Sequence, residues 1–351
     1  MRVAVDATPL VLSSGGLRRY VEGLSVALAK RFPDDTYTLV SDQNFVLPAG
    51  SPANLHAGRP PRTKLEGKWW LAGSSLAVRA SHSQLFHGSN FEVPYLGLYP
   101  AVITIHDLSP WKEAAWNIAA ARVKKRTPWL LRMGLATMII TPSEAVRKEA
   151  IEFFHLQPER VVVTHLAAHP PAAGSKRDAP RPYILYVGAV EPRKNLAMLL
   201  DAWREVRKTN EVDLVIAGRA REGYAIAEQH PGLRVLGEVG DLDLGEWYAG
   251  ASAFVYVSHY EGFGLPVLEA MQHGLPVITS RDPALTEVAG EAALQASSAG
   301  EISQMLRLIL GQADFAEQAA ERSRRRAGDF SWARTAEKTR EVYAEALRRF
   351  G

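Results

Sequence analysis

The sequence predicts an α/β protein built from two Rossmann-like domains, whose parallel sheets face each other across a cleft. Its 351 residues are too many for one ordinary core, since a domain commonly holds about 100–200 residues. Short apolar runs alternate with amphipathic segments along the chain, as expected when helices connect parallel strands. The alternation stops in one proline-rich stretch and then resumes, which indicates two domains.

Composition narrows the class of protein. An apolar content of 47% with 23% charged residues is typical of a globular protein. The chain has no cysteine, which excludes disulfides and thiolate metal sites, and its ten histidines show no metal-site spacing, so we predict no metal cofactor. The sequence lacks a leader-like segment and a long apolar run, so we expect a cytoplasmic protein. A net charge of only +3 gives no reason to expect a nucleic-acid partner.

The first domain is predicted to span residues 1–168. Arg2–Asp6 is a buried strand, the glycine pair Gly15-Gly16 precedes a helix, and Tyr37–Val40 is the next strand, which together make a βαβ unit. Further strands are expected at Gln84–Phe86, Ala101–Ile105, Met138–Thr141 and Val161–Thr164.

The stretch 167–182 has the sequence AAHPPAAGSKRDAPRP and is predicted to be the interdomain linker. The second domain is expected to span residues 182–330. Its predicted strands are Tyr183–Gly188, Leu214–Gly218, Arg234–Gly237, Ala253–Ser258 and Pro276–Ser280. An amphipathic helix over 331–351, which contains Trp332, is expected to dock back on the first domain.

The most informative segment is Tyr260–Gly274, with the sequence YEGFGLPVLEAMQHG. Proline suits the first turn of a helix and glycine its end, so a helix is predicted from about Pro266 to His273. The backbone N–H groups just before it, at Phe263, Gly264 and Leu265, would lie at the carboxyl edge of the sheet, where a diphosphate binds well.

Two glutamates flank this turn, eight positions apart. Glu269, one turn into the helix, can accept hydrogen bonds from a ribose diol, and Glu261, before the turn, can reach a sugar hydroxyl. The simpler interpretation is an ordinary buried strand-to-helix turn with two surface glutamates.

The whole segment resembles the Glu-x7-Glu signature of the retaining glycosyltransferases of family 4, which have the GT-B fold. The resemblance extends over nearly the whole chain and includes Tyr186–Asn195, Asp213–Arg219, His106–Ser109, Thr141–Val146 and Phe330–Trp332. It implies an acceptor-binding N-terminal domain, a donor-binding C-terminal domain, and a hinge between them that lets the enzyme close.

The resemblance also assigns roles to single residues. Glu261 would contact the donor sugar and Glu269 the ribose, while Lys194 aligns with the lysine that grips the diphosphate. The arginine that accompanies this lysine in the family falls on Ala189, so the second cation is assigned to Arg193. His106, which follows the apolar strand Ala101–Ile105, matches the histidine beside the donor sugar.

Three glycine and loop positions complete the predicted donor site. Gly16 resembles the glycine-rich loop that approaches the donor phosphate, although Arg18 stands where the family often has another glycine. Gly188 ends the first predicted strand of the second domain, and Val239 lies where main-chain groups meet the nucleobase. Because backbone contacts do not depend on the side chains, the sequence does not distinguish uracil from guanine as the base of the donor. His87 is either part of the acceptor site or a structural residue.

The resemblance implies metal-free transfer with retention of anomeric configuration. The loop EPRKN is similar to that of bacterial mannosyltransferases of surface-polysaccharide assembly, which favours GDP-mannose over UDP-glucose or UDP-N-acetylglucosamine as donor. The acceptor would be a saccharide, either soluble or lipid-linked. A lipid-linked acceptor would account for Lys68-Trp69-Trp70 and for the stretch Arg122–Arg132, which is rich in arginine and lysine, lacks acids and contains Trp129. This stretch suits an anionic membrane surface, or is a solvated helix face.

Three other functions compete with this interpretation. A sugar-nucleotide epimerase with the same fold would lack the Glu-x7-Glu context and need additional carboxylates. A dinucleotide oxidoreductase needs GxGxxG after the first strand, which Ala7–Arg19 does not provide. A non-catalytic module would bind the nucleotide-sugar without turning it over.

Overall fold

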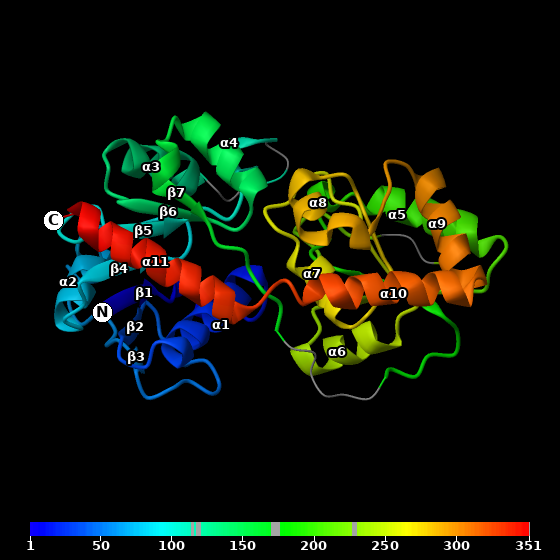
Figure 1. Cartoon of the computed structure of the whole chain (residues 1–351), viewed down its shortest axis with the longest axis horizontal. Helices are drawn as coiled ribbons and strands as arrows, with labels where there is room; N and C mark the ends of the chain where they lie inside the picture. Colours follow the sequence, from blue (N-terminus) through cyan, green and yellow to red (C-terminus); the bar gives the residue numbers. More distant parts are fainter. Residues whose placement is uncertain (114–115, 117–120, 170–175, 227–229, 351) are drawn as a thin grey trace. The chain divides into compact units, whose positions relative to one another are not determined.

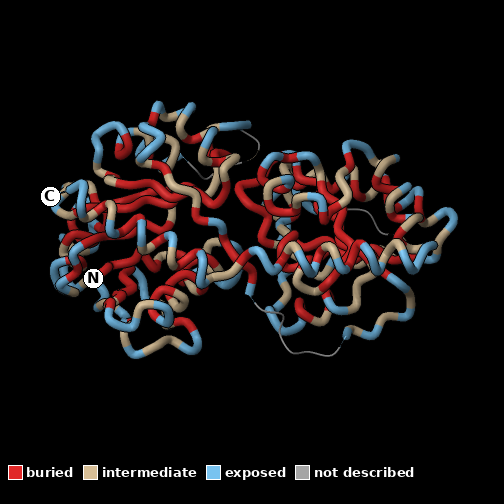
Figure 2. Tube along the Cα trace, in the orientation of Figure 1, coloured by how far each residue is buried: buried red, intermediate tan, exposed pale blue. Residues whose placement is uncertain are grey.

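The computed structural model describes residues 1–113, 116, 121–169, 176–226 and 230–350. The chain divides into two compact units, one formed by Met1–Ala167 with Ser331–Gly351 and the other by Ala168–Phe330 (Figure 1). In each unit the central strands are buried, and the chain outside the strands carries most of the exposed residues (Figure 2). The predicted α/β class with parallel sheets is confirmed.

The first unit contains a parallel sheet of seven strands in the order β3-β2-β1-β4-β5-β6-β7. Their bounds are β1 Arg2–Asp6, β2 Thr36–Val40, β3 Leu55–Ala57, β4 Leu85–Gly88, β5 Ala101–Thr104, β6 Met138–Thr141 and β7 Val161–Val163. The direction of strand order reverses between β1 and β4, so their carboxyl ends form the switch point at which such sheets bind ligands. The short edge strand β3 was missing from the sequence prediction because only Leu55 in it is buried.

Helices and turns of the first unit connect these strands. They are η1 Thr8–Val11, α1 Gly16–Arg31, η2 Trp69–Gly73, α2 Ser74–Ala80, η3 Ser109–Trp111, α3 Ala121–Arg132, α4 Glu144–Phe154, η6 Pro158–Arg160 and α11 Trp332–Phe350. The helix α1 begins directly after Gly15, whose φ of 112° is accessible mainly to glycine. Its buried face carries Tyr20, Leu24 and Leu28, as the helical spacing predicts.

The terminal helix α11 belongs to the first unit, where it packs against α1 and against β4, β5 and β6 (Figure 1). Arg340 donates to the buried Asp35 at 2.6 Å, and the Tyr343 hydroxyl is hydrogen-bonded to His87 Nδ1 at 2.7 Å. The Trp332 ring occupies the space beside Gly23 of α1 that a Cβ would need. The absence of a side chain at position 23 therefore allows the two helices to pack.

Replacing Gly23 by alanine should destabilise the protein, because the new methyl group collides with the Trp332 ring. Overpacking of this kind costs about 1–3 kcal/mol, and chemical denaturation would measure the loss. The matched control is Gly311→Ala at the exposed last residue of a helix, where a Cβ has open space. If the two variants are equally stable, the contact between α1 and α11 is looser than described.

The second unit contains a parallel sheet of six strands in the order β10-β9-β8-β11-β12-β13. Their bounds are β8 Tyr183–Val187, β9 Asp213–Ala217, β10 Leu233–Gly237, β11 Ala253–Tyr256, β12 Val277–Thr279 and β13 Leu294–Gln295. Its helices are η7 Pro192–Lys194, α5 Leu196–Arg207, α6 Asp241–Gly250, α7 Leu265–Gln272, α8 Pro283–Ala289, η8 Gly290–Ala292, α9 Ala299–Gly311 and α10 Ala313–Ala327. Here the switch point lies between β8 and β11.

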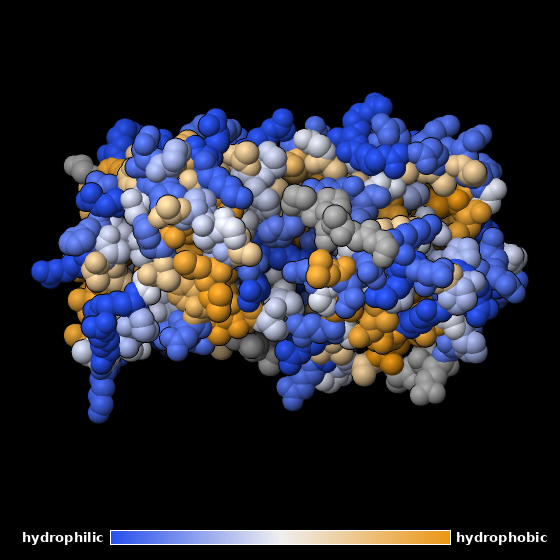
Figure 3. Space-filling view, turned by 90° about the horizontal axis from the view of Figure 1, so that it is seen from below, coloured by the Kyte–Doolittle hydropathy of each residue, from blue (hydrophilic) through white to orange (hydrophobic). Residues whose placement is uncertain are grey.

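The face drawn in Figure 3 is largely hydrophilic, with apolar side chains gathered in separate patches. Trp69 and Trp70 do not contribute to such a patch, because both are buried in a cluster with Ala4, Val78 and Phe86. The suggestion that these tryptophans contact a lipid acceptor is therefore wrong. Within the described part of the chain, no helix is both long and apolar enough to cross a membrane.

Candidate active site

The loop that follows β8 forms one side of the switch point in the second unit. Gly188 has a φ of 155°, and a Cβ there would stand 2.8 Å from the Tyr186 hydroxyl. This glycine lets the chain leave the strand and reach η7, which ends at Lys194. Asn195, with a φ of 53°, then starts α5. The loop thereby brings Arg193 and Lys194 to the carboxyl edge of the sheet.

Lys194 and Glu261 form a buried ion pair at this edge. Lys194 Nζ donates to Glu261 Oε1 at 2.6 Å and to the Tyr256 hydroxyl at 2.8 Å, and both charged residues are less than 10% exposed. Burial opposes ionisation of Glu261, but Lys194 and Arg193 outweigh it and lower the pKa of this carboxyl to about 2. Burial lowers the pKa of Lys194, and the adjacent carboxylate counteracts that effect. We take the pair as ionised because the ammonium lies within hydrogen-bonding distance of two oxygen atoms.

Arg193 joins the same cluster. Its Nη1 donates to Glu261 Oε2 at 3.2 Å and to the Tyr260 carbonyl at 2.9 Å, while its Nη2 donates to Glu191 Oε1 at 3.0 Å. The cluster thus contains two cations and two carboxylates. Glu191 was not predicted from the sequence, although its position in EPRKN, two residues before the arginine, was a usable signal.

The turn that carries Glu261 is held by Asp282, at the end of the segment that follows β12. Asp282 Oδ2 accepts from the Glu261 N–H at 3.2 Å, and Oδ1 accepts from the N–H groups of Ala284 and Leu285 at 3.0 Å. Burial raises the pKa of Asp282 to about 6, despite these three donors. Sequence reasoning missed this residue because it is distant from the glutamate in the chain.

The raised pKa of Asp282 predicts a specific pH dependence of stability. Its folded-state pKa lies above the ordinary value of 3.8, so its stabilising contribution is full below about pH 4 and is lost as the pH rises through about 6. The difference corresponds to about 3 kcal/mol. The free energy of unfolding of wild-type protein should therefore fall between pH 4 and pH 7 relative to that of Asp282→Asn. Parallel curves for the two proteins would contradict the shift.

The helix α7 runs from Leu265 to Gln272, within one residue of the predicted bounds. Gly264 before it has a φ of 101°, and Gly274 after it has a φ of 68°. Glu269 is buried on this helix, and its Oε2 accepts from the Tyr248 hydroxyl at 3.0 Å. Tyr248, on α6, was not predicted. Phe263 and Gly264, in the turn before α7, and Leu265, its first residue, are all buried.

Val239 lies half-buried in the short segment between β10 and α6. The strand leading to it is joined to its neighbour by the bond from Gly218 N–H to the Gly237 carbonyl, at 2.7 Å. Both β9 and β10 are on the far side of β8 from β11. This places Val239 at a different part of the sheet edge from Glu261.

In the first unit His106 follows β5 and is half-buried. Its Nε2 donates to the Ser89 carbonyl at 2.7 Å, and its ring lies edge-on to the Tyr20 ring at 4.9 Å. Burial lowers the pKa of His106, so the ring is neutral near pH 7. His106 is in a different unit from the Lys194–Glu261 pair.

The glycine-rich loop and His87 have distinct positions. Gly16 is the first residue of α1, and Arg18 donates to the carbonyls of Leu10 and Leu12 at 2.9 and 2.8 Å. Arg18 therefore stabilises the neighbouring turn. His87 is fully buried between the hydroxyls of Tyr343 and Thr104, and burial lowers its pKa to about 3. His87 is therefore a structural residue and not part of an acceptor site.

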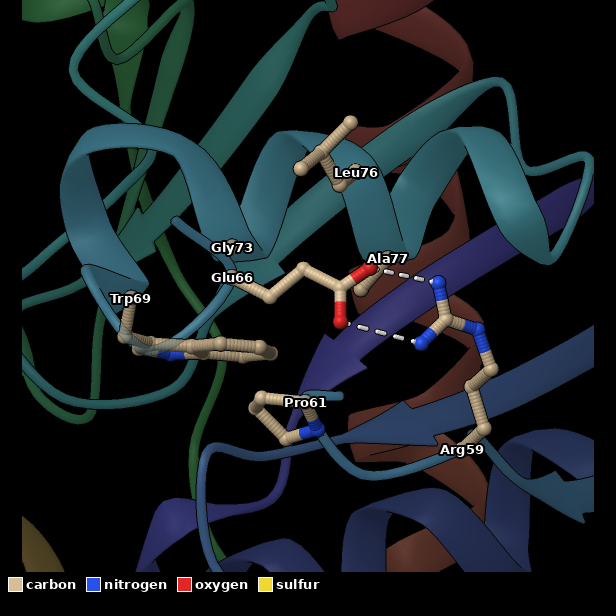
Figure 4. Close-up of a pocket in the computed structure, with 7 residues that line it drawn as sticks. All are labelled: Arg59, Pro61, Glu66, Trp69, Gly73, Leu76 and Ala77. Carbon is tan, nitrogen blue, oxygen red and sulfur yellow. Dashed lines mark hydrogen bonds and ion pairs between the residues drawn. The ribbon is translucent and has the colours of Figure 1, made fainter. Parts of the chain in front are cut away.

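A small cavity of about 10 Å³ lies elsewhere in the first unit. Glu66 stands there between the Trp69 ring and the Arg59 guanidinium, to which it is ion-paired (Figure 4). The cavity has room for about one water molecule, and none of its lining residues is a predicted site residue. Among the described residues, no three acidic or histidine side chains are grouped so that they could hold a metal ion.

Comparison with known proteins identifies the family of this chain. Residues 14–170 match the family model "Glycosyltransferase Family 4", and residues 181–312 match "Glycosyl transferases group 1". The O-antigen chain mannosyltransferase B of Escherichia coli is 33% identical over 298 residues, which cover 76% of each chain. The chain belongs to the family 4 glycosyltransferases.

More distant relatives of this glycosyltransferase differ in the sugar that their names indicate. The glycogen synthase of Mycobacterium tuberculosis is 28% identical over 398 aligned positions, covering 99% of this chain and 95% of the relative. Among solved structures, sucrose-phosphate synthase from Thermosynechococcus elongatus has a TM-score of 0.71 at 18% identity and 98% coverage of both chains. HepE of Anabaena with UDP-glucose has a TM-score of 0.72 at 15% identity, covering 98% of this chain and all of the other. These likenesses confirm the GT-B fold.

Proposed function

We propose that this glycosyltransferase moves a hexose from a nucleoside diphosphate sugar to a saccharide acceptor in polysaccharide synthesis. The carrying observation is the cluster of Arg193 and Lys194 with Glu261 at the switch point of the second unit. A departing nucleoside diphosphate gathers negative charge, and two cations held in place beforehand would stabilise it. The donor's diphosphate would then displace the carboxylates as the partners of these cations.

The other donor contacts follow from the same edge of the sheet. The buried turn Phe263–Leu265 would bind the diphosphate at the start of α7, and Glu269 would accept hydrogen bonds from the ribose. Gly188 and Gly16 would let the backbone approach the donor, and Val239 would contact the nucleobase. His106 would accept a hydrogen bond from a hydroxyl group of the transferred sugar.

For the chemistry we propose front-face transfer with retention and without a metal. The acceptor oxygen forms a bond to the anomeric carbon on the side from which the diphosphate leaves. The bond between that carbon and the phosphate oxygen breaks, and the hydroxyl proton passes to the departing diphosphate. No nucleophile of the protein is required, and Arg193 and Lys194 would supply the charge stabilisation that a metal provides in other enzymes.

GDP-mannose is the donor that we favour, with UDP-glucose or UDP-N-acetylglucosamine as the alternative. The mannosyltransferase of E. coli supports the first choice, while HepE, solved with UDP-glucose, and the glycogen synthase support the second. The test is turnover of the three donors with a panel of saccharide acceptors, with and without EDTA, followed by NMR of the anomeric proton of the product. Binding without turnover of any donor would favour the non-catalytic module, and loss of turnover in EDTA would contradict metal-free transfer.

We also propose that the exposed face of α3 contacts an anionic membrane surface. Trp129 is 45% and Met133 60% exposed, and on the same helical face Lys125 and Arg132 are exposed. The stretch Arg122–Arg132 contains no acidic residue, but Arg122 forms an ion pair with Glu92, which lies outside the stretch, at 3.0 Å. Apolar side chains beside lysine and arginine are typical of membrane-surface helices.

Reversing two charges on this face should release the enzyme from vesicles that contain anionic lipid. The test is Lys125→Glu with Arg132→Glu in a cosedimentation assay, since each basic residue near such a surface contributes about 1 kcal/mol. The control, Lys208→Glu with Arg325→Glu, reverses two exposed charges in the second unit. Equal vesicle binding by both variants would exclude α3 as the contact.

A further inference from the structure

Two buried polar side chains meet at the switch point of the first sheet, where β1 and β4 end. Asp6 is the last residue of β1 and Ser89 follows β4, and each is 1% exposed. Ser89 Oγ donates to Asp6 Oδ2 at 2.9 Å. This bond ties together the ends of two neighbouring strands at the position where α/β sheets bind their ligands.

The main chain of Ser89 also controls His106. A carbonyl oxygen only accepts hydrogen bonds, so the contact of 2.7 Å between the Ser89 carbonyl and His106 Nε2 requires the proton to be on Nε2. In the neutral ring Nδ1 then carries a lone pair. The orientation and the tautomer of His106 therefore depend on where the Ser89 carbonyl stands.

The contacts around Ser89 restrict the position of its main chain. A Cβ at the preceding Gly88 would collide with the Glu92 carbonyl, so the chain turns tightly here. Asp6 Oδ1 accepts from the Thr8 N–H at 3.2 Å and from the Thr8 hydroxyl at 2.6 Å. The carboxylate of Asp6 thus holds the η1 turn with one oxygen and the Ser89 turn with the other.

Burying the Asp6 carboxylate costs free energy, so filling space in the core does not account for this residue. In the described part of the chain no cation is paired with this carboxylate, and burial raises its pKa to about 6. A buried carboxylate without a counter-charge costs free energy that a neutral side chain would avoid. It does, however, accept from two segments at once, which no hydroxyl or amide of similar size does equally well.

We propose that Asp6 is a positioning residue for His106. It holds the Ser89 turn so that the Ser89 carbonyl fixes the Nε2-protonated tautomer, leaving Nδ1 as the acceptor for a substrate hydroxyl. The last step rests on the proposed function, whereas the effect of Asp6 on the histidine tautomer does not.

The test is Asp6→Leu, with Asp42→Asn as control. A leucine is close in size to aspartate but accepts no hydrogen bond, so it releases both Ser89 and Thr8. Asp42 is an exposed carboxylate whose charge acts on Asp6, so its variant removes the same charge without breaking these hydrogen bonds. We expect Asp6→Leu to lower kcat on the order of tenfold to a hundredfold, the effect typical of a misplaced group. The donor KM should change by less than about twofold, because Arg193, Lys194 and Glu269, the proposed partners of the nucleoside diphosphate, are in the other unit. Asp42→Asn should keep wild-type kinetics.

Nitrogen-15 NMR of the histidine rings in the nucleotide-free protein separates positioning from a general loss of structure. The His106 signal, assigned from a His106→Gln spectrum, should show one Nε2-protonated tautomer in wild type and a mixture of both in Asp6→Leu. Ser89→Ala removes the hydroxyl but keeps the carbonyl and should reproduce this mixture, which provides the test if Asp6→Leu does not fold. A wild-type tautomer in either variant overturns the proposal. If the tautomer changes while kcat stays at the wild-type level, Asp6 positions His106 but the proposed contact with substrate fails.

Discussion

Replacing Lys194 by alanine is expected to reduce sugar transfer by at least about a thousandfold. Removal of one group that stabilises developing negative charge commonly costs a factor of a hundred to a thousand, and here Glu261 also loses its partner at 2.6 Å. Arg193 would then be the remaining cation beside Glu261, which leaves one positive charge fewer to balance the diphosphate of the donor. Turnover of the preferred donor under saturating acceptor measures the effect.

The control for this substitution is Lys208→Ala, because Lys208 is an exposed lysine of the same unit. It should have wild-type turnover. Circular dichroism of Lys194→Ala should retain the wild-type spectrum, since Arg193 still neutralises Glu261. A folded Lys194→Ala variant with wild-type turnover would refute the assigned role of this lysine.

The second large effect is expected from Glu269→Ala, which should weaken nucleoside diphosphate binding by about 10- to 100-fold. Hydrogen bonds to a charged group contribute about 1.5–3 kcal/mol, and Glu269 is buried with one oxygen bonded to Tyr248. The remaining acceptor capacity of the carboxylate suits a ribose diol. Isothermal titration calorimetry would measure the loss.

The same experiment with a 2′-deoxynucleotide identifies the contact. Wild-type protein should bind the deoxynucleotide more weakly than the ribonucleotide, and Glu269→Ala should no longer distinguish them. Glu291→Ala, at an exposed glutamate of the same unit, should behave as wild type. If Glu269→Ala retains full discrimination, this glutamate does not bind the ribose.

The fold was largely predictable because its strands and helices differ in local pattern. Arg2–Asp6 and Met138–Thr141 are strands with the predicted bounds, and α7 begins and ends where Pro266 and Gly274 indicate. The edge strands β3 and β13 have only three and two residues, too few for a period to appear in the sequence. These residues form strands because they pair with β2 and β12, their neighbours in the sheets.

The candidate site was predictable only in part, since its contacts join residues that are distant in sequence. Lys194 and Glu261 were found through separate motifs, and the structure brings them into contact. Asp282 and Tyr248, which hold Glu261 and Glu269, lie outside those motifs. The burial of Trp69 likewise depends on Phe86 and its neighbours in the sheet, so lysine beside tryptophan in sequence was misleading.

The most direct test of the central claim is calorimetric titration of GDP and UDP into wild-type protein in the presence of EDTA. We predict that one of the two, GDP under the proposed function, binds in the micromolar range or tighter, and that Lys194→Ala abolishes this binding. Binding that disappears in EDTA, or the absence of binding by either nucleotide, would contradict a metal-free donor site built from Arg193, Lys194 and Glu269.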